Sequence, residues 1–309
     1  MDSRMSHMPD ELFKVVGRKD DEIDKIARPS LTFLKDSWIR LKKNKAAIFS
    51  LIVLALIILF ALIGPFMSSY NYYQTDYTKT YQPPGGEHWL GTDKFGRDQW
   101  TRIWDGTRIS LYIAFLAAIL DIAIGVTFGA TAALVGGKLD SLMQRVIEIL
   151  IGIPHLIIVI LLIMMVEPGI LSITVAMVIT GWVNMARLVR AQIFKFKNQE
   201  FILASRSLGA TNRRIMFHHM IPNTIGLIII NMMFTIPSAI FTEAFLSFIG
   251  LGLQAPQASL GVLINDGFQA MRTSFYLLIY PAIIITALMI CFNLLADGLR
   301  DAFDPKMRK

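Results

Sequence analysis

Residues 46–67 read AAIFSLIVLALIILFALIGPFM, and this stretch decides the fold class. It has no charged side chain, and a helix needs about 20 predominantly apolar residues to cross the hydrocarbon core of a bilayer. The stretch is longer than the apolar core of a cleaved signal peptide, and the mostly polar residues 1–45 precede it. We therefore expect a retained membrane-spanning helix.

Five further apolar stretches are long enough to span a membrane. They cover residues 109–135, 142–166, 169–186, 222–243 with an apolar continuation, and 273–296. The sequence therefore predicts an all-α polytopic membrane protein with six transmembrane helices. Prolines inside such helices are tolerated and kink them, so we expect kinks at Pro154, Pro237 and Pro281.

The composition agrees with a membrane protein. Hydrophobic residues make up 54% of the 309 residues and charged residues only 17%, whereas about a quarter of the residues are charged in a typical soluble domain. The net charge of +7 does not indicate a nucleic-acid partner, because the basic residues lie between apolar runs rather than on one binding face. Cys291 is the only cysteine, which excludes an intramolecular disulfide and cysteine-based metal sites.

Lysine and arginine collect on the cytoplasmic side of membrane proteins. Five basic residues crowd positions 35–45 directly before the first stretch, and the loop after the fourth carries seven against Glu200 alone. The loop 68–108 is balanced, with five basic and five acidic residues. We therefore expect both termini in the cytoplasm. The residues that set this bias are Lys35, Arg40, Lys42, Lys43, Lys45, Arg187, Arg190, Lys195, Lys197, Arg206, Arg213 and Arg214, with Lys306, Arg308 and Lys309 in the tail.

The resulting domain organisation has five parts. A cytoplasmic segment, expected to be partly disordered or to lie on the membrane surface, precedes the first helix. An extracytoplasmic loop follows that helix, and a five-helix core with a cytoplasmic loop at 198–222 leads to a short cytoplasmic tail. The boundaries are 1–45, 46–67, 68–108, 109–298 and 299–309.

The cytoplasmic loop NQEFILASRSLGATNRRIMFHHMIPN begins at Asn198 and predicts two short helices. Residues 200–208 suit a helix, and Gly209 suits its left-handed C-cap. Thr211 or Asn212 can then cap a second helix. The small residues Ala204 and Ser205 would let the groove of a partner approach closely. An ordinary amphipathic connector is an equally good interpretation from these residues alone.

The same loop resembles the EAA loop in the permease subunits of bacterial ABC importers. That pattern is Glu-Ala-Ala, three residues, Gly, then nine residues to an Ile-x-Leu-Pro ending. Ala204, Gly209 and Pro222 match it. The departures are Leu203, Ser205, His219 and Ile221.

Three other segments resemble the permease C subunits of oligopeptide and dipeptide importers within that family. HWLGTDKFGRDQWTRIWDGTRISL from His88 is similar to their GTDxxGRD signature. FTEAFLSFIGLGLQAPQASLG from Phe241 is similar to their EAFLSxLGLG segment, and DGLRDAFDPKMRK from Asp297 to their C-terminus. The resemblance covers nearly the whole chain after about residue 30.

The resemblance implies the type I ABC importer permease fold in a bacterial plasma membrane. It also implies a second homologous permease subunit, two cytoplasmic ATPase subunits and an extracytoplasmic peptide-binding protein. ATP and magnesium would be bound by the ATPases, with no cofactor on this chain. The residues expected to contact the ATPases are Glu200, Leu203, Ala204, Ser205, Leu208, Gly209, Ala210 and Thr211.

The extracytoplasmic loop permits two interpretations. Its glycines separate opposite charges, Asp93 beside Lys94 and Arg97 beside Asp98, which favours a folded loop that neutralises itself. The loop would also suit contact with the binding protein or a cap over the pore. The candidate residues are Gly91, Thr92, Asp93, Gly96, Arg97 and Asp98.

Asp121 and Glu243 lie inside apolar stretches. A carboxylate within a membrane is costly unless it faces a bundle interior or a water-filled path, so both are candidates for the transport pathway. A structural role is the alternative for each, for Glu243 at a helix end or paired with an arginine. For Asn184, Asn231 and Asn293 we expect interhelical hydrogen bonds, and for His155 a satisfied core position.

Catalytic motifs are absent from the sequence. There is no GxxxxGK[ST] loop, GxSxG or HExxH, so we expect no P-loop, no enzyme activity and no metal site. A dipeptide, nickel or other small-solute importer stays open within the family. From another class, a secondary transporter that relays protons through Asp121 and Glu243 is the rival; a membrane-anchored structural protein would leave these carboxylates unexplained.

Overall fold

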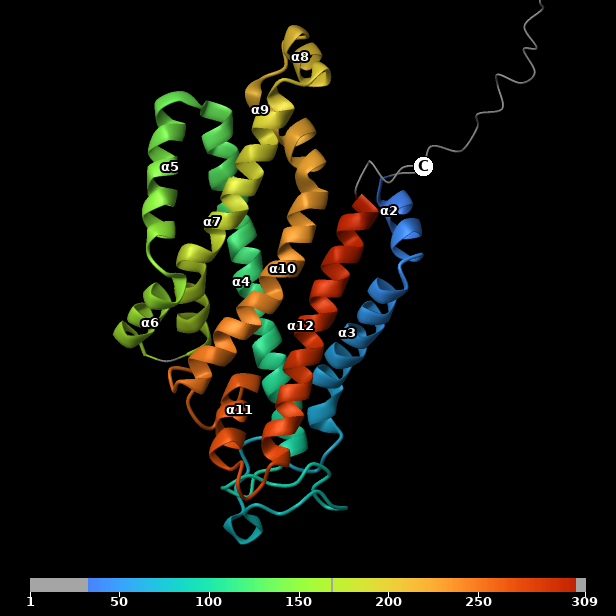
Figure 1. Ribbon diagram of the computed structural model, residues 1–309, viewed down its shortest axis with the longest axis vertical. Helices are drawn as coiled ribbons and strands as arrows, with labels where there is room; N and C mark the ends of the chain where they lie inside the picture. Colours follow the sequence, from blue (N-terminus) through green and yellow to red (C-terminus); the bar gives the residue numbers. More distant parts are fainter. Residues whose placement is uncertain (1–32, 168, 304–309) are drawn as a thin grey trace, which may run out of the picture.

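The computed structural model describes residues 33–167 and 169–303, and in this part of the chain the regular elements are helices (Figure 1). The predicted disordered or surface-bound segment falls largely on residues 1–32, outside the described residues. The elements are α2 Phe33–Leu41, α3 Lys45–Ile63, α4 Gln99–Val135, α5 Gly137–Gly152, α6 His155–Met165, α7 Ile170–Lys197, α8 Glu200–Ser207, α9 Asn212–Ile215, a π-helical turn Met216–Met220, α10 Ile221–Phe248, α11 Leu260–Gln269 and α12 Tyr276–Phe303.

Five helices are long and apolar enough to cross a membrane, and a bent pair makes a sixth if it counts as one span. The five are α3 with the turn after it, α4, α7, α9 with α10, and α12. The prediction of an all-α polytopic fold is confirmed.

The third predicted stretch, 142–166, is two helices rather than one. α5 and α6 meet at an angle of 83°. Pro154 lacks the N–H that a continuing helix needs, and the residue before it is forced out of the helical region; Ile153 is accordingly extended, with φ −104° and ψ 128°. The kink expected at Pro154 is therefore a complete break, whereas Pro237 and Pro281 lie inside helices that continue past them.

Three helices extend well beyond the apolar stretches that predicted them. α4 begins at Gln99 instead of 109, α7 continues to Lys197 instead of 186, and α12 to Phe303 instead of 296. At a rise of about 1.5 Å per residue, each of these three helices is longer than the roughly 30 Å thickness of the hydrocarbon core. An apolar run marks only the part of a helix that lies in lipid, because backbone hydrogen bonding continues into water.

Figure 1 shows a bundle with two different ends. One end carries α2, α8, α9 and the C-terminal end of α12; the other carries the 67–98 loop and α11. The basic residues that precede α3 and those around α8 therefore lie at the same end, opposite the 67–98 loop.

Glycines allow the closest helix contacts. A Cβ on Gly129 of α4 would lie 2.3 Å from the carbonyl oxygen of Ala186 in α7, and one on Gly125 would lie 2.6 Å from the Cβ of Met185. These glycines form a GxxxG pair, a sequence signal of close helix packing that our sequence interpretation did not use. α4 and α7 thus pack as one unit. On the other side of α4, α3 packs against α12, where a Cβ on Gly298 would meet Ala47 at 2.4 Å.

Candidate functional site

The segment 199–215 projects beyond the bundle at the basic end (Figure 1). α8 ends in a left-handed C-cap: Gly209 has φ +82°, its N–H donates to the carbonyl of Arg206, and the Ala210 N–H donates to that of Ser205. These two bonds define a Schellman motif, which satisfies carbonyls left free at a helix end. Thr211 then caps α9 by accepting a hydrogen bond from the Arg214 N–H at 3.3 Å. The predicted helix–glycine–helix is confirmed.

One side chain anchors α8 to the bundle. Ile202 is fully buried in a cluster with Ile193 of α7 and Ile215 of α9, and it is the only buried residue of α8. The sequence interpretation missed Ile202, because Phe201 and Leu203 on either side of it are apolar too and the sequence does not distinguish the three. Ala204 and Thr211 are exposed and Ser205 and Ala210 half-buried.

The other large apolar side chains of α8 and its C-cap are uncovered. Leu208 is 89% exposed, Leu203 49% and Phe201 42%. α8 is therefore a short, capped helix that is fixed on one side and presents an apolar face outward. Exposed apolar patches on a water-facing surface mark interaction sites.

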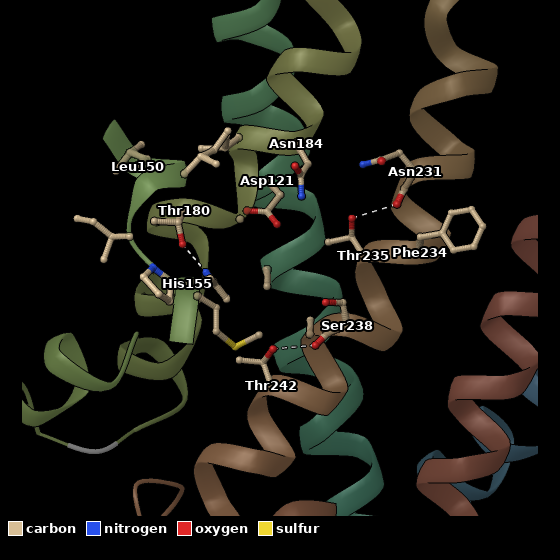
Figure 2. Close-up of a pocket in the computed structure, with 18 residues that line it drawn as sticks. Asp121, Leu150, His155, Thr180, Asn184, Asn231, Phe234, Thr235, Ser238 and Thr242 are labelled. Atoms are coloured by element: carbon tan, nitrogen blue, oxygen red, sulfur yellow. Dashed lines mark hydrogen bonds between the residues drawn. The ribbon is translucent and has the colours of Figure 1, made fainter. Parts of the chain in front are cut away.

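A cavity of about 480 Å³ opens between α4, α7, α10 and the break between α5 and α6 (Figure 2). Its polar lining comes from Asp121 on α4, Thr180 and Asn184 on α7, and α10. Figure 2 shows Asp121 and Asn184 on one side and Asn231 across from them. The polar residues that line it are Asp121, His155, Thr180, Asn184, Asn231, Thr235, Ser238 and Thr242.

Asp121 is 94% buried by its neighbours, with 6% of its surface exposed, yet it faces this cavity. Its carboxylate lies against the backbone of Gly181, where a Cβ would be only 2.6 Å from Oδ2 and 2.7 Å from Oδ1. Among the described protein groups, Oδ1 has no hydrogen-bond partner. His155 is engaged through Nδ1 with the Thr180 hydroxyl, as expected for a satisfied histidine.

Glu243 lies elsewhere and does not line the cavity. It is fully buried, and its carboxylate accepts hydrogen bonds from Ser110 of α4 at 2.9 Å and from Ser247 at 2.7 Å. The Ser110 oxygen in turn accepts from the Leu260 N–H at 3.1 Å, which ties in the start of α11. Glu243 thus joins α4, α10 and α11 through serines, not through the arginine that the structural interpretation allowed.

The six candidate residues of the 67–98 loop are buried. Asp93 pairs with Arg97 at 2.7 Å instead of with its neighbour Lys94, and Asp98 contacts His88 at 2.9 Å and caps α4 through the Thr101 N–H. The pairings expected from sequence neighbours are wrong, because the turn at Gly96, with φ +70°, brings residue 97 back over residue 93.

The loop is tied to α11 by ion pairs and closed on itself by backbone contacts. Asp266 of α11 lies 3.4 Å from Arg102, 3.3 Å from Lys94 and 3.9 Å from Arg97. Thr92 accepts from the Gln82 N–H at 2.8 Å, and a Cβ on Gly91 would be 2.5 Å from the Gln82 carbonyl oxygen. The loop therefore neutralises itself, as one interpretation expected, but with Asp266 as a distant partner.

The described residues contain no group of three or more histidine, cysteine, aspartate or glutamate side chains that could hold a metal ion.

Comparison of the sequence with known proteins assigns the chain to a family. Residues 125–309 match the family described as "Binding-protein-dependent transport system inner membrane component". Residues 32–84 match "N-terminal TM domain of oligopeptide transport permease C".

The chain is 47% identical to the dipeptide transport system permease protein of Bacillus subtilis, over 98% of this chain and 95% of that protein. It is 45% identical to the oligopeptide transport system permease protein of the same species, over 99% and 100%. Its fold resembles a chain of the MetNI methionine ABC transporter, solved in inward-facing conformations, with a TM-score of 0.54 and 18% identity over 65% of this chain and 96% of that one.

The family match covers more than half of the chain, and nearly half of the residues are identical to those of a relative along almost the full length. The chain belongs to the family of binding-protein-dependent transport system inner-membrane components and is a multi-pass permease with the ABC importer fold.

Proposed function

We propose that this chain is a non-catalytic permease subunit of an ATP-driven peptide importer, with α8 as the element that an ATPase moves. The observation that carries the proposal is the exposed apolar face of α8, held at the basic end by the single anchor Ile202. Motion applied to α8 is transmitted to α7 and α9, because Ile202 packs in one cluster with their side chains.

The contact with the ATPases would use residues on both sides of Gly209. Leu203, Ala204 and Leu208 offer the apolar surface, and Gly209 fixes the angle between α8 and α9. Glu200 stands at the N-terminus of α8, where a negative charge is favoured by the helix dipole. Ser205, Ala210 and Thr211 complete the predicted contact.

The orientation of the chain in the membrane is inferred from its basic residues. Because basic residues crowd the end with α2 and α8, we place that end and both termini in the cytoplasm. The 67–98 loop then faces the extracytoplasmic binding protein. The six buried candidate residues would hold the loop in shape. Direct contact with the binding protein would be made by exposed aromatic residues of the same loop: Tyr73, Tyr77 and Trp89.

Peptides are the proposed substrate because the two Bacillus relatives are named for dipeptide and oligopeptide transport. The cavity beside Asp121 would be this subunit's half of the pathway, completed by a second homologous permease subunit. Two ATPase subunits would bind ATP and magnesium, so this chain needs no cofactor of its own. Nickel or another small solute is the alternative cargo.

A single exposed side chain tests the coupling role. Leu208→Glu should abolish co-purification of the ATPase from detergent and ATP-driven peptide uptake, since a charge replaces an apolar contact without touching the bundle. Tyr77→Glu is the control for ATPase binding alone, with 71% exposure at the opposite end, and should keep the ATPase bound even where it weakens contact with the binding protein and so lowers uptake. Retention of the ATPase by Leu208→Glu would contradict the proposal.

The proton-coupled alternative gains no support from the geometry. Its relay needs Asp121 and Glu243 along one path, but Glu243 is enclosed by serines outside the cavity. Uptake driven by a proton gradient without any ATPase would favour this alternative.

A further inference from the structure

The cavity at the break between α5 and α6 combines one carboxylate with neutral polar groups. Asp121 is its only acidic lining residue, and of the described residues that line it none is lysine or arginine. Its other titratable side chain, His155, is already engaged with Thr180. The cavity therefore holds one carboxyl group that no cationic side chain of its own lining neutralises.

The position of this carboxylate is built into the packing. Gly181 is the reason that Asp121 fits, because any Cβ at that position would overlap both carboxylate oxygens. The carboxylate is thereby fixed against α7 with Oδ1 unpartnered, at a depth where a charge is costly without a counter-charge. Such a group is stabilised when a cation enters the cavity.

The neutral part of the lining suits a peptide backbone. Asn184 and Asn231 offer amide donors and acceptors from opposite sides of the cavity (Figure 2). The hydroxyls of Thr235 and Thr242 donate to carbonyls of their own helix, at 3.0 and 2.9 Å, so their oxygens stay available as acceptors. The same cavity thus offers acceptors in addition to the carboxylate, which an ammonium group with three N–H donors can use.

A second cavity of about 560 Å³ shares Asn184 with the first and has the opposite charge. Arg187 and Arg190 line it, and Arg190 is already paired with Asp140 through two contacts of 2.6 Å. The arginines repel an ammonium group from this neighbouring cavity. Of the two cavities, the one that holds Asp121 therefore suits an ammonium group better.

We propose that Asp121, held by Gly181, binds the cationic amino terminus of the transported peptide inside this subunit. The inference rests on the proposed function and adds a recognition step to it within the membrane. A free amino terminus is the cationic group that unmodified peptides of any sequence share. A charge-assisted hydrogen bond is about twice as strong as a neutral one.

The test is equilibrium binding to the complete, nucleotide-free importer in nanodiscs, without the binding protein. The probe is a tripeptide with uncharged side chains and a fluorophore on its C-terminus, with either a free or an acetylated amino terminus. Fluorescence anisotropy should show the free-amine probe binding roughly tenfold more weakly to Asp121→Asn than to the wild type. The acetylated probe should bind both proteins equally weakly.

Two glycine variants separate position from charge. Gly181→Ala should weaken the free-amine probe as Asp121→Asn does, because the new Cβ displaces the carboxylate. Gly152→Ala is the matched control, since a Cβ there meets nothing within 4 Å, and it should bind as the wild type does. An acetylated probe with a lysine side chain shows whether an ammonium group at another position can substitute.

Two results would overturn the inference: equal binding of both probes to the wild type, including no saturable binding of either, or unchanged binding of the free-amine probe to Asp121→Asn. The proposed function fails in a different way, through loss of the ATPase subunits or of ATP-driven uptake in the wild-type complex. An importer that assembles and transports peptides but ignores the amino terminus at Asp121 would retain the function and lose only this inference.

Discussion

Replacing Ile202 by alanine should release α8 from the bundle while the rest of the chain stays folded. Ile202 is fully buried and is the only buried side chain of α8. Truncation of a buried isoleucine to alanine costs about 2–5 kcal/mol, and the lower half applies here because neighbouring side chains at a helix end can collapse into the space. A cost of about 2–3 kcal/mol raises the undocked population roughly 30- to 150-fold.

Amide hydrogen exchange of the purified chain in detergent measures this population directly. The N–H groups of Leu203 and Leu208 bond to carbonyls of Gln199 and Ala204, so their exchange reports the docked helix. Exchange over residues 203–210 should accelerate by that factor in Ile202→Ala. Exchange in α4 and α12 should not change.

Leu203→Ala is the matched control. It removes a side chain of the same size from the adjacent position of the same helix, but Leu203 is half exposed and contributes no buried anchor. Equal acceleration in both variants, or none in Ile202→Ala, would refute the view that one buried side chain fixes α8.

The remaining predictions concern two carboxylates. Glu243→Ala should lower the free energy of unfolding by about 2–4 kcal/mol, because two buried serine hydroxyls lose their acceptor and a space opens between α10 and α11. Glu243→Gln should cost less, and peptide uptake per folded complex should persist in both; normal thermal stability with lost uptake would instead indicate a pathway residue. In the 67–98 loop, the ammonium of Lys79, followed by the hydroxyl of Tyr70, lowers the pKa of Glu87. Because the pKa of Glu87 is lower in the folded state, its ionised carboxylate stabilises the loop. This stabilisation is fully present above the ordinary carboxyl pKa of 4.5, and it is lost as the pH falls through the lowered pKa of the folded state. The protection of residues 79–87 against amide exchange, measured relative to the intrinsic exchange rate at each pH, should therefore fall in acid in the wild type, and Glu87→Gln should remove that fall; an unchanged loss of protection in Glu87→Gln would contradict this assignment.

Much of the structure of segment 199–215 was predictable because it is local. Gly209 follows the end of α8, where a residue in the left-handed conformation closes the last turn. Thr211 comes two residues later, in position to cap α9. The role of Ile202 was not predictable, since Phe201, Ile202 and Leu203 are all apolar. Only the packing of α7 and α9 decides which of the three faces inward.

The sequence by itself determined the apolar helices, the end at which positive charge collects and the glycine-capped loop. These properties depend on transfer of side chains into lipid and on hydrogen bonds between near neighbours in the chain. The tertiary structure alone decided how far the chain bends at Pro154, the partners of Asp266, and the different surroundings of Asp121 and Glu243. Two carboxylates in similar apolar stretches differ because one faces a cavity beside a glycine and the other faces serines on two helices. The contacts of Asp121 with Gly181, of Glu243 with Ser110 and of Asp266 with Arg102 join residues far apart in the chain, and no local pattern encodes them.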